Sequence, residues 1–159
     1  MLHEILGRLF VIVTGANPKI ALAVWYSTDS DRTKQRMLSA AISALPDDRW
    51  PQRPRAREDL QWLLVRTNSL ADQRNNAIHA PGALYCGSGV AGGMEIAPSF
   101  LQGHPRATRL MGKPLLDEFE WCKRCTEILT EFALAAETSL SVEQHPWPDR
   151  PKIPTRGRR

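Results

Sequence analysis

Cysteines and long apolar runs are both scarce in this chain of 159 residues. The three cysteines are an odd number, which argues against a disulfide framework and predicts a reducing, cytoplasmic environment. We expect no signal peptide. The apolar stretch at residues 5–13 is interrupted by Arg8 and is far too short to span a bilayer, so we expect a core helix there and no membrane association.

The signatures of several enzyme classes are also missing. The sequence contains no glycine-rich phosphate loop, no nucleophile elbow and no pair of catalytic carboxylates. These absences exclude the enzyme classes that depend on such motifs. We expect no cofactor.

What is present is typical of a globular domain. Hydrophobic residues make up 42% of the chain and charged residues 24%, which suits one domain with a sizeable core. The net charge is +4 and the isoelectric point about 9.3. This balance permits a polyanionic partner such as RNA but does not require one.

Apolar spacing and capping residues predict a mostly helical chain. Asn17 followed by Pro18 is typical of a helix start, and Asp29 or Ser30 would cap the next helix. The predicted helices cover residues 2–14, 18–26, 31–45, 55–80 and about 113–140.

The region between the last two helices has a different character. Two short apolar segments flank a glycine-rich turn that ends at Gly92 and Gly93, which predicts a small β-hairpin within residues 83–98. We therefore predict an all-α fold in residues 1–142, an antiparallel bundle of four to five helices with a hairpin and loop insertion at about 83–112. The tail, residues 143–159, has four prolines and a basic end, and its composition predicts disorder.

The helix predicted over residues 55–80 carries an apolar stripe that ends at an arginine. At three- and four-residue spacing the stripe contains Leu60, Leu63, Leu64, Thr67, Leu70 and Ala71. Arg74 takes the next position, where another leucine would be expected. Because a guanidinium that faces a core or an interface is costly without an acceptor, we predict that Arg74 meets an anion there.

Two further polar residues follow Arg74 near the end of this helix. Asn75 and His79 are four residues apart and share a helical face, and Arg74 lies about 100° away around the axis. The carbonyls at a helix C-terminus favour a protonated imidazole, so His79 suits a general acid or base. Arg74 would hold a phosphate by a bidentate contact, and Asn75 would orient the histidine or the phosphate. Together they predict metal-independent attack of an RNA 2′-hydroxyl on the adjacent phosphate.

The hexapeptide RNNAIH at positions 74–79 resembles the R-N-x-x-x-H motif of HEPN-domain proteins. The order of elements is also similar, with paired helices, the motif late in a long helix, and a closing helix. The resemblance implies a metal-independent endoribonuclease with Arg74, Asn75 and His79 as its site, often in toxin–antitoxin, antiphage or RNA-processing systems. It further implies a homodimer whose two motifs form one cleft, and a cognate antitoxin or partner protein. The short first helix and the excursion at residues 83–98 depart from the family's pattern.

A simpler interpretation stays open for the same residues. Arg74 would pair internally, with Glu58 or Asp59 of a partner helix or with Glu118, and His79 would cap the helix C-terminus. The chain would then be a non-catalytic helical module of the same fold that dimerises and binds a partner or a nucleotide.

Other groups of residues are weaker candidates for a site. Cys122 and Cys125 have CxxC spacing but lie within a predicted helix, and Cys86 and His104 would complete a zinc set only if the fold brought them together, so we predict core packing and no metal. Five arginines are candidates for RNA contact, with a solvated face as the alternative: Arg53, Arg55, Arg57, Arg106 and Arg109.

Overall fold

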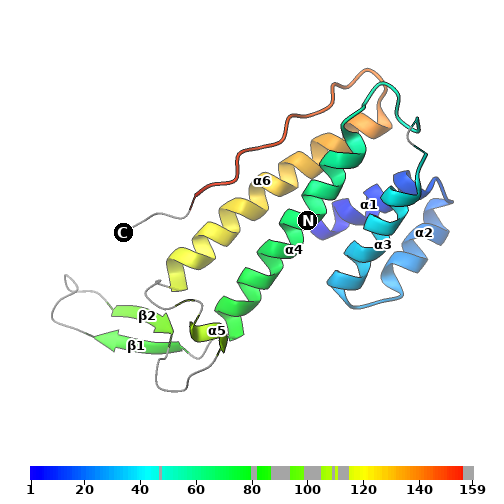
Figure 1. Ribbon diagram of the computed structural model, residues 1–159. Coiled ribbons are helices and arrows are strands. Elements are labelled where there is room, and N and C mark those ends of the chain that lie inside the picture. The colour runs from blue at the N-terminus through cyan, green and yellow to red at the C-terminus, as the bar shows by residue number, and fades with distance from the viewer. Residues whose placement is uncertain are drawn as a thin grey trace. The chain divides into compact units, whose positions relative to one another are not determined.

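The computed structural model describes residues 1–46, 48–79, 82–86, 94–98, 105–108, 110 and 115–155. This part of the chain is mainly helical, in agreement with the predicted all-α class (Figure 1). Its helices are α1 (Leu2–Thr14), α2 (Pro18–Tyr26), α3 (Asp31–Ala44), α4 (Ala56–His79), α5 (Pro105–Thr108) and α6 (Leu115–Ser141).

The chain divides into two compact units. The first unit consists of Met1–Asn68 and Thr126–Ile153, and the second unit of Ser69–Cys125 and Pro154–Arg159. The boundaries between them fall within α4, within α6 and after Ile153. The start of α4 and the end of α6 therefore belong to the first unit, and their other ends to the second.

Local capping explains where the first helices begin and end. Gly15 follows α1 in a left-handed conformation, with φ of 62°, which glycine adopts without steric cost. The Asn17 side chain accepts a hydrogen bond from the backbone N–H of Lys19 at 3.0 Å, and Ser30 accepts one from Thr33 at 3.2 Å. The predicted caps at Asn17 and Ser30 are confirmed.

The core of the first unit is built around a buried tryptophan. α1 packs against α2 and α3, and Trp25 of α2 is fully buried with its ring centroid 5.4 Å from that of Phe10. Gly7 of α1 leaves room for the indole, since a Cβ there would stand 3.0 Å from Trp25 Nε1. Leu6, Leu9, Val13, Leu38, Ile42, Leu60, Leu63 and Leu129 are also fully buried. Each such aliphatic side chain contributes roughly 1.5–3 kcal/mol by leaving water.

An ion pair joins α1 to the end of α6 within the first unit. Arg8 of α1 donates to both carboxylate oxygens of Glu137 on α6, at 2.6 and 2.8 Å. This hydrogen bonding raises the pKa of Arg8 above its ordinary value. The bidentate geometry fixes the orientation of the two side chains as well as their distance.

The second unit contains the end of α4, the start of α6, the short α5 and two strands. β1 (Gly82–Cys86) and β2 (Met94–Pro98) pair antiparallel, from Gly82 opposite Pro98 to Cys86 opposite Met94. The turn of the predicted hairpin, residues 87–93, lies outside the described residues.

Residues that follow α6 continue as an extended segment. Half-buried prolines recur at every third residue, at Pro148, Pro151 and Pro154, and the residue after each of them is exposed. A repeat of three residues is that of a polyproline II helix. We call residues 146–155 the proline strap. Composition predicts disorder for residues 143–159, and it does not reveal the hydrogen bonds that Trp147, Arg150 and Pro154 make within this segment.

The described residues contain neither a membrane-spanning helix nor a metal-binding cluster. No helix there combines the length and the apolar character that crossing a membrane requires. No group of three or more histidine, cysteine, aspartate or glutamate side chains within that part of the chain is placed to hold a metal ion.

Candidate functional site

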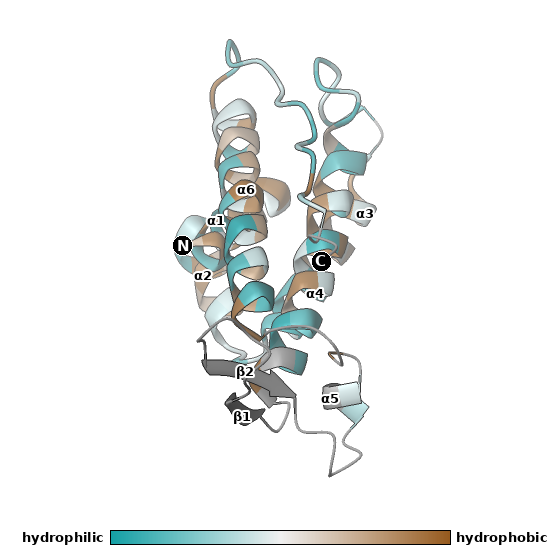
Figure 2. Cartoon of the chain, turned by 90° about the vertical axis from the view of Figure 1, so that its left-hand side faces the viewer, coloured by the Kyte–Doolittle hydropathy of each residue, from teal (hydrophilic) through white to brown (hydrophobic). Residues whose placement is uncertain are grey.

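The apolar stripe of α4 ends before it reaches Arg74. Leu60, Leu63 and Leu64 are at most 3% exposed, Leu70 is 9% exposed and Ala71 is half-buried. Arg74 itself is exposed. Figure 2 shows the same change along α4, whose last turns are hydrophilic.

The exposure of Arg74 bears on the prediction that this arginine faces a core or an interface. Arg74 has the spacing of the stripe but does not face a core of this chain, because a stripe position is buried only where another element packs against it. Internal pairing with Asp59 is not observed either, since that carboxylate binds Arg150, Arg55 and Trp147. Of the other two proposed internal partners, Glu58 binds Arg150 and Glu118 is buried.

The motif is located on the last turns of α4, in the second unit. Arg74 and Asn75 are both exposed, and His79 is the last residue of the helix. The side chain of His79 lies outside the described part of the chain. Regular helical spacing places residues 75 and 79 one turn apart on a common face. The guanidinium and the amide are thus accessible to a ligand beside a helix C-terminus.

The net positive charge of the protein belongs to the unit that carries this motif. The second unit contains nine lysines and arginines and five aspartates and glutamates, which gives +4. The first unit contains twelve of each sign and has no net charge. A surplus of one sign attracts a polyanion to that part of the molecule.

The basic cluster before α4 has structural contacts in the first unit. Arg53 Nη2 donates to the carbonyl oxygens of Val142 and Glu143, at 3.2 and 2.9 Å, just after the end of α6. Arg57 donates to the carbonyl oxygen of Leu45, just after α3. These guanidinium groups satisfy carbonyls that a helix end leaves without intrahelical partners. These contacts give Arg53 and Arg57 a place in the fold, and the RNA contact predicted for the cluster stays a prediction.

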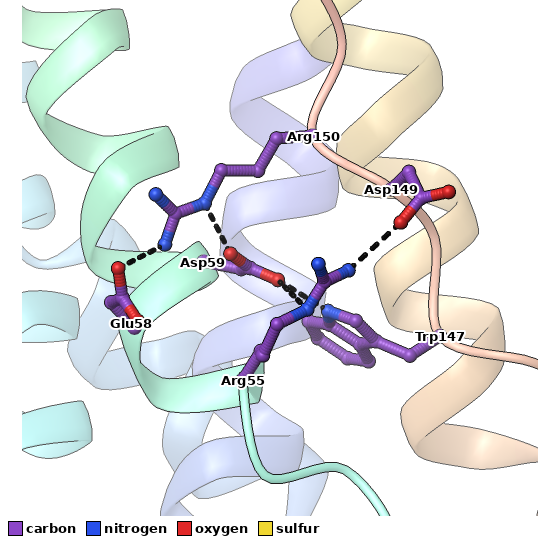
Figure 3. A network of polar contacts seen from close by, with 6 residues as sticks. All are labelled: Arg55, Glu58, Asp59, Trp147, Asp149 and Arg150. Atoms are coloured by element: carbon purple, nitrogen blue, oxygen red, sulfur yellow. Dashed lines mark hydrogen bonds and ion pairs between the residues drawn. The ribbon is translucent and has the colours of Figure 1, made fainter.

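Arg55, the third member of the cluster, belongs to a network around a buried carboxylate (Figure 3). Asp59 of α4 is fully buried. Its Oδ2 accepts a hydrogen bond from Trp147 Nε1 at 2.7 Å and lies 3.7 Å from Arg55 Nε, while its Oδ1 accepts from Arg150 Nε. Three donors around one carboxylate offset the cost of burying its charge.

The outer part of the network reaches solvent. Arg150 Nη2 lies 2.7 Å from Glu58 Oε1, and Arg55 Nη2 lies 3.0 Å from Asp149 Oδ1. The hydrogen bonds to Glu58 and then to Asp59 raise the pKa of Arg150 above its ordinary value. This network tethers the proline strap to α4, and we assign it a structural role.

Sequence reasoning missed this network, although one signal was present. Asp59 lies three residues after Ala56 and four before Leu63, both fully buried, so it occupies the buried face of α4. Asp59 is fully buried, whereas Arg74, which follows the apolar stripe at the same spacing, is exposed.

The remaining candidates fall into two groups. Cys122 and Cys125 are both buried in α6, as the core-packing interpretation expects. Arg109 and His104 lie outside the described residues, as do the side chains of Cys86 and Arg106.

Comparisons with known proteins give no relative from which a role could be transferred. No protein-family model, no curated protein and no solved structure matches the chain.

Proposed function

We propose that this protein is a metal-independent endoribonuclease of the HEPN type, with Arg74, Asn75 and His79 as its site. One observation carries the proposal: Arg74 and Asn75 are solvent-exposed beside the helix end at His79, in the unit that holds all the net positive charge. An exposed arginine in a basic surrounding is suited to binding an external phosphate.

The chemistry assigned to the site follows from the three side chains. Arg74 binds the scissile phosphate and stabilises the negative charge that develops on its oxygens. His79 transfers protons, which lets the ribose 2′-oxygen form a bond to phosphorus while the bond to the 5′-oxygen breaks. Asn75, one helical turn from His79, positions the imidazole or the phosphate. The products are a 2′,3′-cyclic phosphate and a 5′-hydroxyl.

A second copy of the chain completes the site in this proposal. One chain supplies one motif, and acid and base catalysis of the same step needs two proton-transferring groups. The second unit has apolar side chains for such a contact: Leu116 is 58% exposed and Ile78 is 51% exposed. We infer a cytoplasmic homodimer that acts in a toxin–antitoxin or defence system, with an antitoxin or other protein as its regulator.

The experiment compares RNA cleavage in the presence of EDTA by the wild type and by His79→Ala, Arg74→Ala and Asn75→Ala. We expect cleavage by the wild type and its loss in the variants. The control is Arg36→Ala, which removes an exposed helical arginine from the first unit and should cleave normally. If His79→Ala cleaves as fast as the wild type, the catalytic proposal is wrong. A wild type that dimerises and binds RNA or a nucleotide without cleaving it would identify the non-catalytic module instead.

A further inference from the structure

Within the first unit, the proline strap is attached in the way that a peptide ligand is attached to its receptor. Among the described residues, no backbone–backbone hydrogen bond joins residues 146–153 to another element. Side chains make the attachment: Trp147 Nε1 donates to Asp59 Oδ2 at 2.7 Å, and Arg150 Nε donates to Oδ1 of the same carboxylate (Figure 3). The attachment therefore depends on the identity of two residues that the strap carries.

The spacing of these two residues fits the extended conformation of the strap. A polyproline II helix repeats every three residues, so Trp147 and Arg150 lie on one side of it. Asp149 and Lys152, on another side, are exposed. Proline-spaced segments in this conformation are ligands that aromatic-lined grooves recognise in other proteins.

The part of α4 that the strap contacts has a matching chemistry. We call Glu58, Asp59 and Trp62 the strap face. Glu58 Oε1 lies 2.7 Å from Arg150 Nη2, and the Arg150 guanidinium lies 5.9 Å from the centre of the Trp62 ring. The Trp62 ring packs edge-to-face against Phe132 of α6, with 5.4 Å between the ring centres. Two carboxylates beside an aromatic ring favour a segment that carries an arginine.

The strap face depends on donors that the strap supplies. Trp147 and Arg150 both donate to the carboxylate of Asp59, which is fully buried. Arg55 of the same helix region contacts this carboxylate at a longer distance, 3.7 Å from its Nε. Because a buried carboxylate that loses hydrogen-bond donors is costly, a face without its strap favours any segment that brings an indole N–H and a guanidinium at the same spacing.

We propose that the strap face is a docking site for the proline strap of a second copy of this chain, so that two chains exchange straps. Every copy carries Trp147 and Arg150, and exchange makes between two chains the contacts that the strap makes within one. Residues 141–146, which join α6 to the strap, are all exposed, so they can redirect it without uncovering buried side chains of their own. The inference goes beyond the proposed function, because the strap face lies in the first unit and the motif at Arg74 in the second.

The first experiment asks whether the face binds a separate strap. The receptor is the full chain with Trp147→Phe and Arg150→Gln, which we call the strap variant; its own strap lacks both donors and its strap face is intact. The probe is a fluorescein-labelled peptide with the sequence of residues 144–153, followed by anisotropy. We expect saturable binding, and binding about tenfold weaker or more to the wild type, whose own strap occupies the face. Absence of binding to the strap variant would overturn the proposal.

Two altered peptides with the same change of charge test the contacts. The Arg150→Glu peptide places a carboxylate against Glu58 and Asp59, and we expect its affinity to fall about tenfold or more. The Lys152→Glu peptide alters an exposed position and should bind like the parent peptide. Equal binding of all three peptides would contradict a specific site.

Circular dichroism covers the case in which the strap variant unfolds. The parent peptide should then restore its helical signal, and the Arg150→Glu peptide should not. A strap variant that stays unfolded with the parent peptide would also overturn the docking site.

The last experiment asks whether the strap of a whole second chain reaches the face. Unlabelled Asp59→Asn, whose strap is intact and whose own face lacks the buried charge, should displace the peptide from the strap variant. Glu58→Arg, at a side chain that is 75% exposed, is a second competitor that repels its own Arg150 and keeps the buried carboxylate. The control, Asp59→Asn combined with Trp147→Phe and Arg150→Gln, should not displace the peptide. Peptide binding that neither competitor reduces would overturn strap exchange and identify a different protein as the occupant.

Discussion

The indole N–H of Trp147 donates a hydrogen bond of 2.7 Å to the buried carboxylate of Asp59, 88 residues earlier in the chain. This contact joins the proline strap to α4 at a buried carboxylate that Arg150 and Arg55 also bind. Whether the strap is part of the fold can therefore be measured through these two residues.

Trp147→Phe should destabilise the fold. The variant keeps an aromatic ring and removes the donor to Asp59, and a hydrogen bond to a charged group contributes about 1.5–3 kcal/mol. Urea unfolding measures the change, and Asp59→Asn completes a double-mutant cycle. We expect the two substitutions to be coupled by about 0.5–3 kcal/mol, as residues in one network are. Strictly additive effects would mean that the strap does not depend on this contact.

Gly7→Ala should also destabilise the fold, although alanine favours helices. The new Cβ would stand 3.0 Å from Trp25 Nε1 and 3.2 Å from its Cδ1, against a fully buried indole. Overpacking of this kind costs about 1–3 kcal/mol, which exceeds the roughly 1 kcal/mol that alanine gains over glycine within a helix. Thermal unfolding measures the balance. Trp25→Phe, which removes the nearest atom, should lessen the penalty in the double variant, and a stabilised Gly7→Ala would refute the steric argument.

Arg53→Ala should lower stability and leave RNA binding unchanged. The guanidinium donates to Ser139 Oγ at 3.0 Å and to the carbonyls of Val142 and Glu143, so its loss removes charged hydrogen bonds at the end of α6. We expect a loss of about 1.5–3 kcal/mol in urea unfolding. Arg36→Ala, at an exposed site on α3, serves as the control with little effect. Weaker RNA binding at unchanged stability would restore the role that the sequence predicted for Arg53.

Arg74→Ala and Asn75→Ala should unfold like the wild type. Both side chains are exposed, and surface substitutions usually change stability by no more than about 0.5 kcal/mol. Circular dichroism and thermal unfolding are the measurements, made on the same samples as the cleavage assays. A large loss of stability in Arg74→Ala would indicate a structural role for this arginine.

Much of the fold could be predicted from the sequence because its signals are local. The caps at Asn17 and Ser30 and the buried leucines of α4 follow from contacts within one helical turn or from helical spacing. Spacing alone gives the direction of a side chain, not the extent of the surface that covers it. This is why the stripe correctly predicted the burial of Leu63, whereas Arg74, at the next position of the same stripe, is exposed.

The strap could not be predicted in this way. Its prolines suggest disorder, since they offer few backbone donors and little apolar surface. What orders the segment is Asp59, whose buried position on α4 needs donors that arrive from Trp147 and Arg150. Hydrogen-bonded residues that are 88 and 91 positions apart leave no pattern within a short stretch of sequence. A buried-face aspartate before a leucine stripe is the signal that could have prompted the search for such partners.

The most direct test of the proposed nuclease is the identity of the RNA ends that the wild type produces in EDTA. The measurement uses an end-labelled RNA and the same RNA carrying 2′-O-methyl groups, with products resolved by gel and mass spectrometry. The proposed site at Arg74, Asn75 and His79 predicts 2′,3′-cyclic phosphate and 5′-hydroxyl ends, no cleavage of the methylated RNA, and no cleavage by His79→Ala. Cleavage of the methylated RNA at the same rate, or products with 5′-phosphates, would contradict attack by the 2′-hydroxyl.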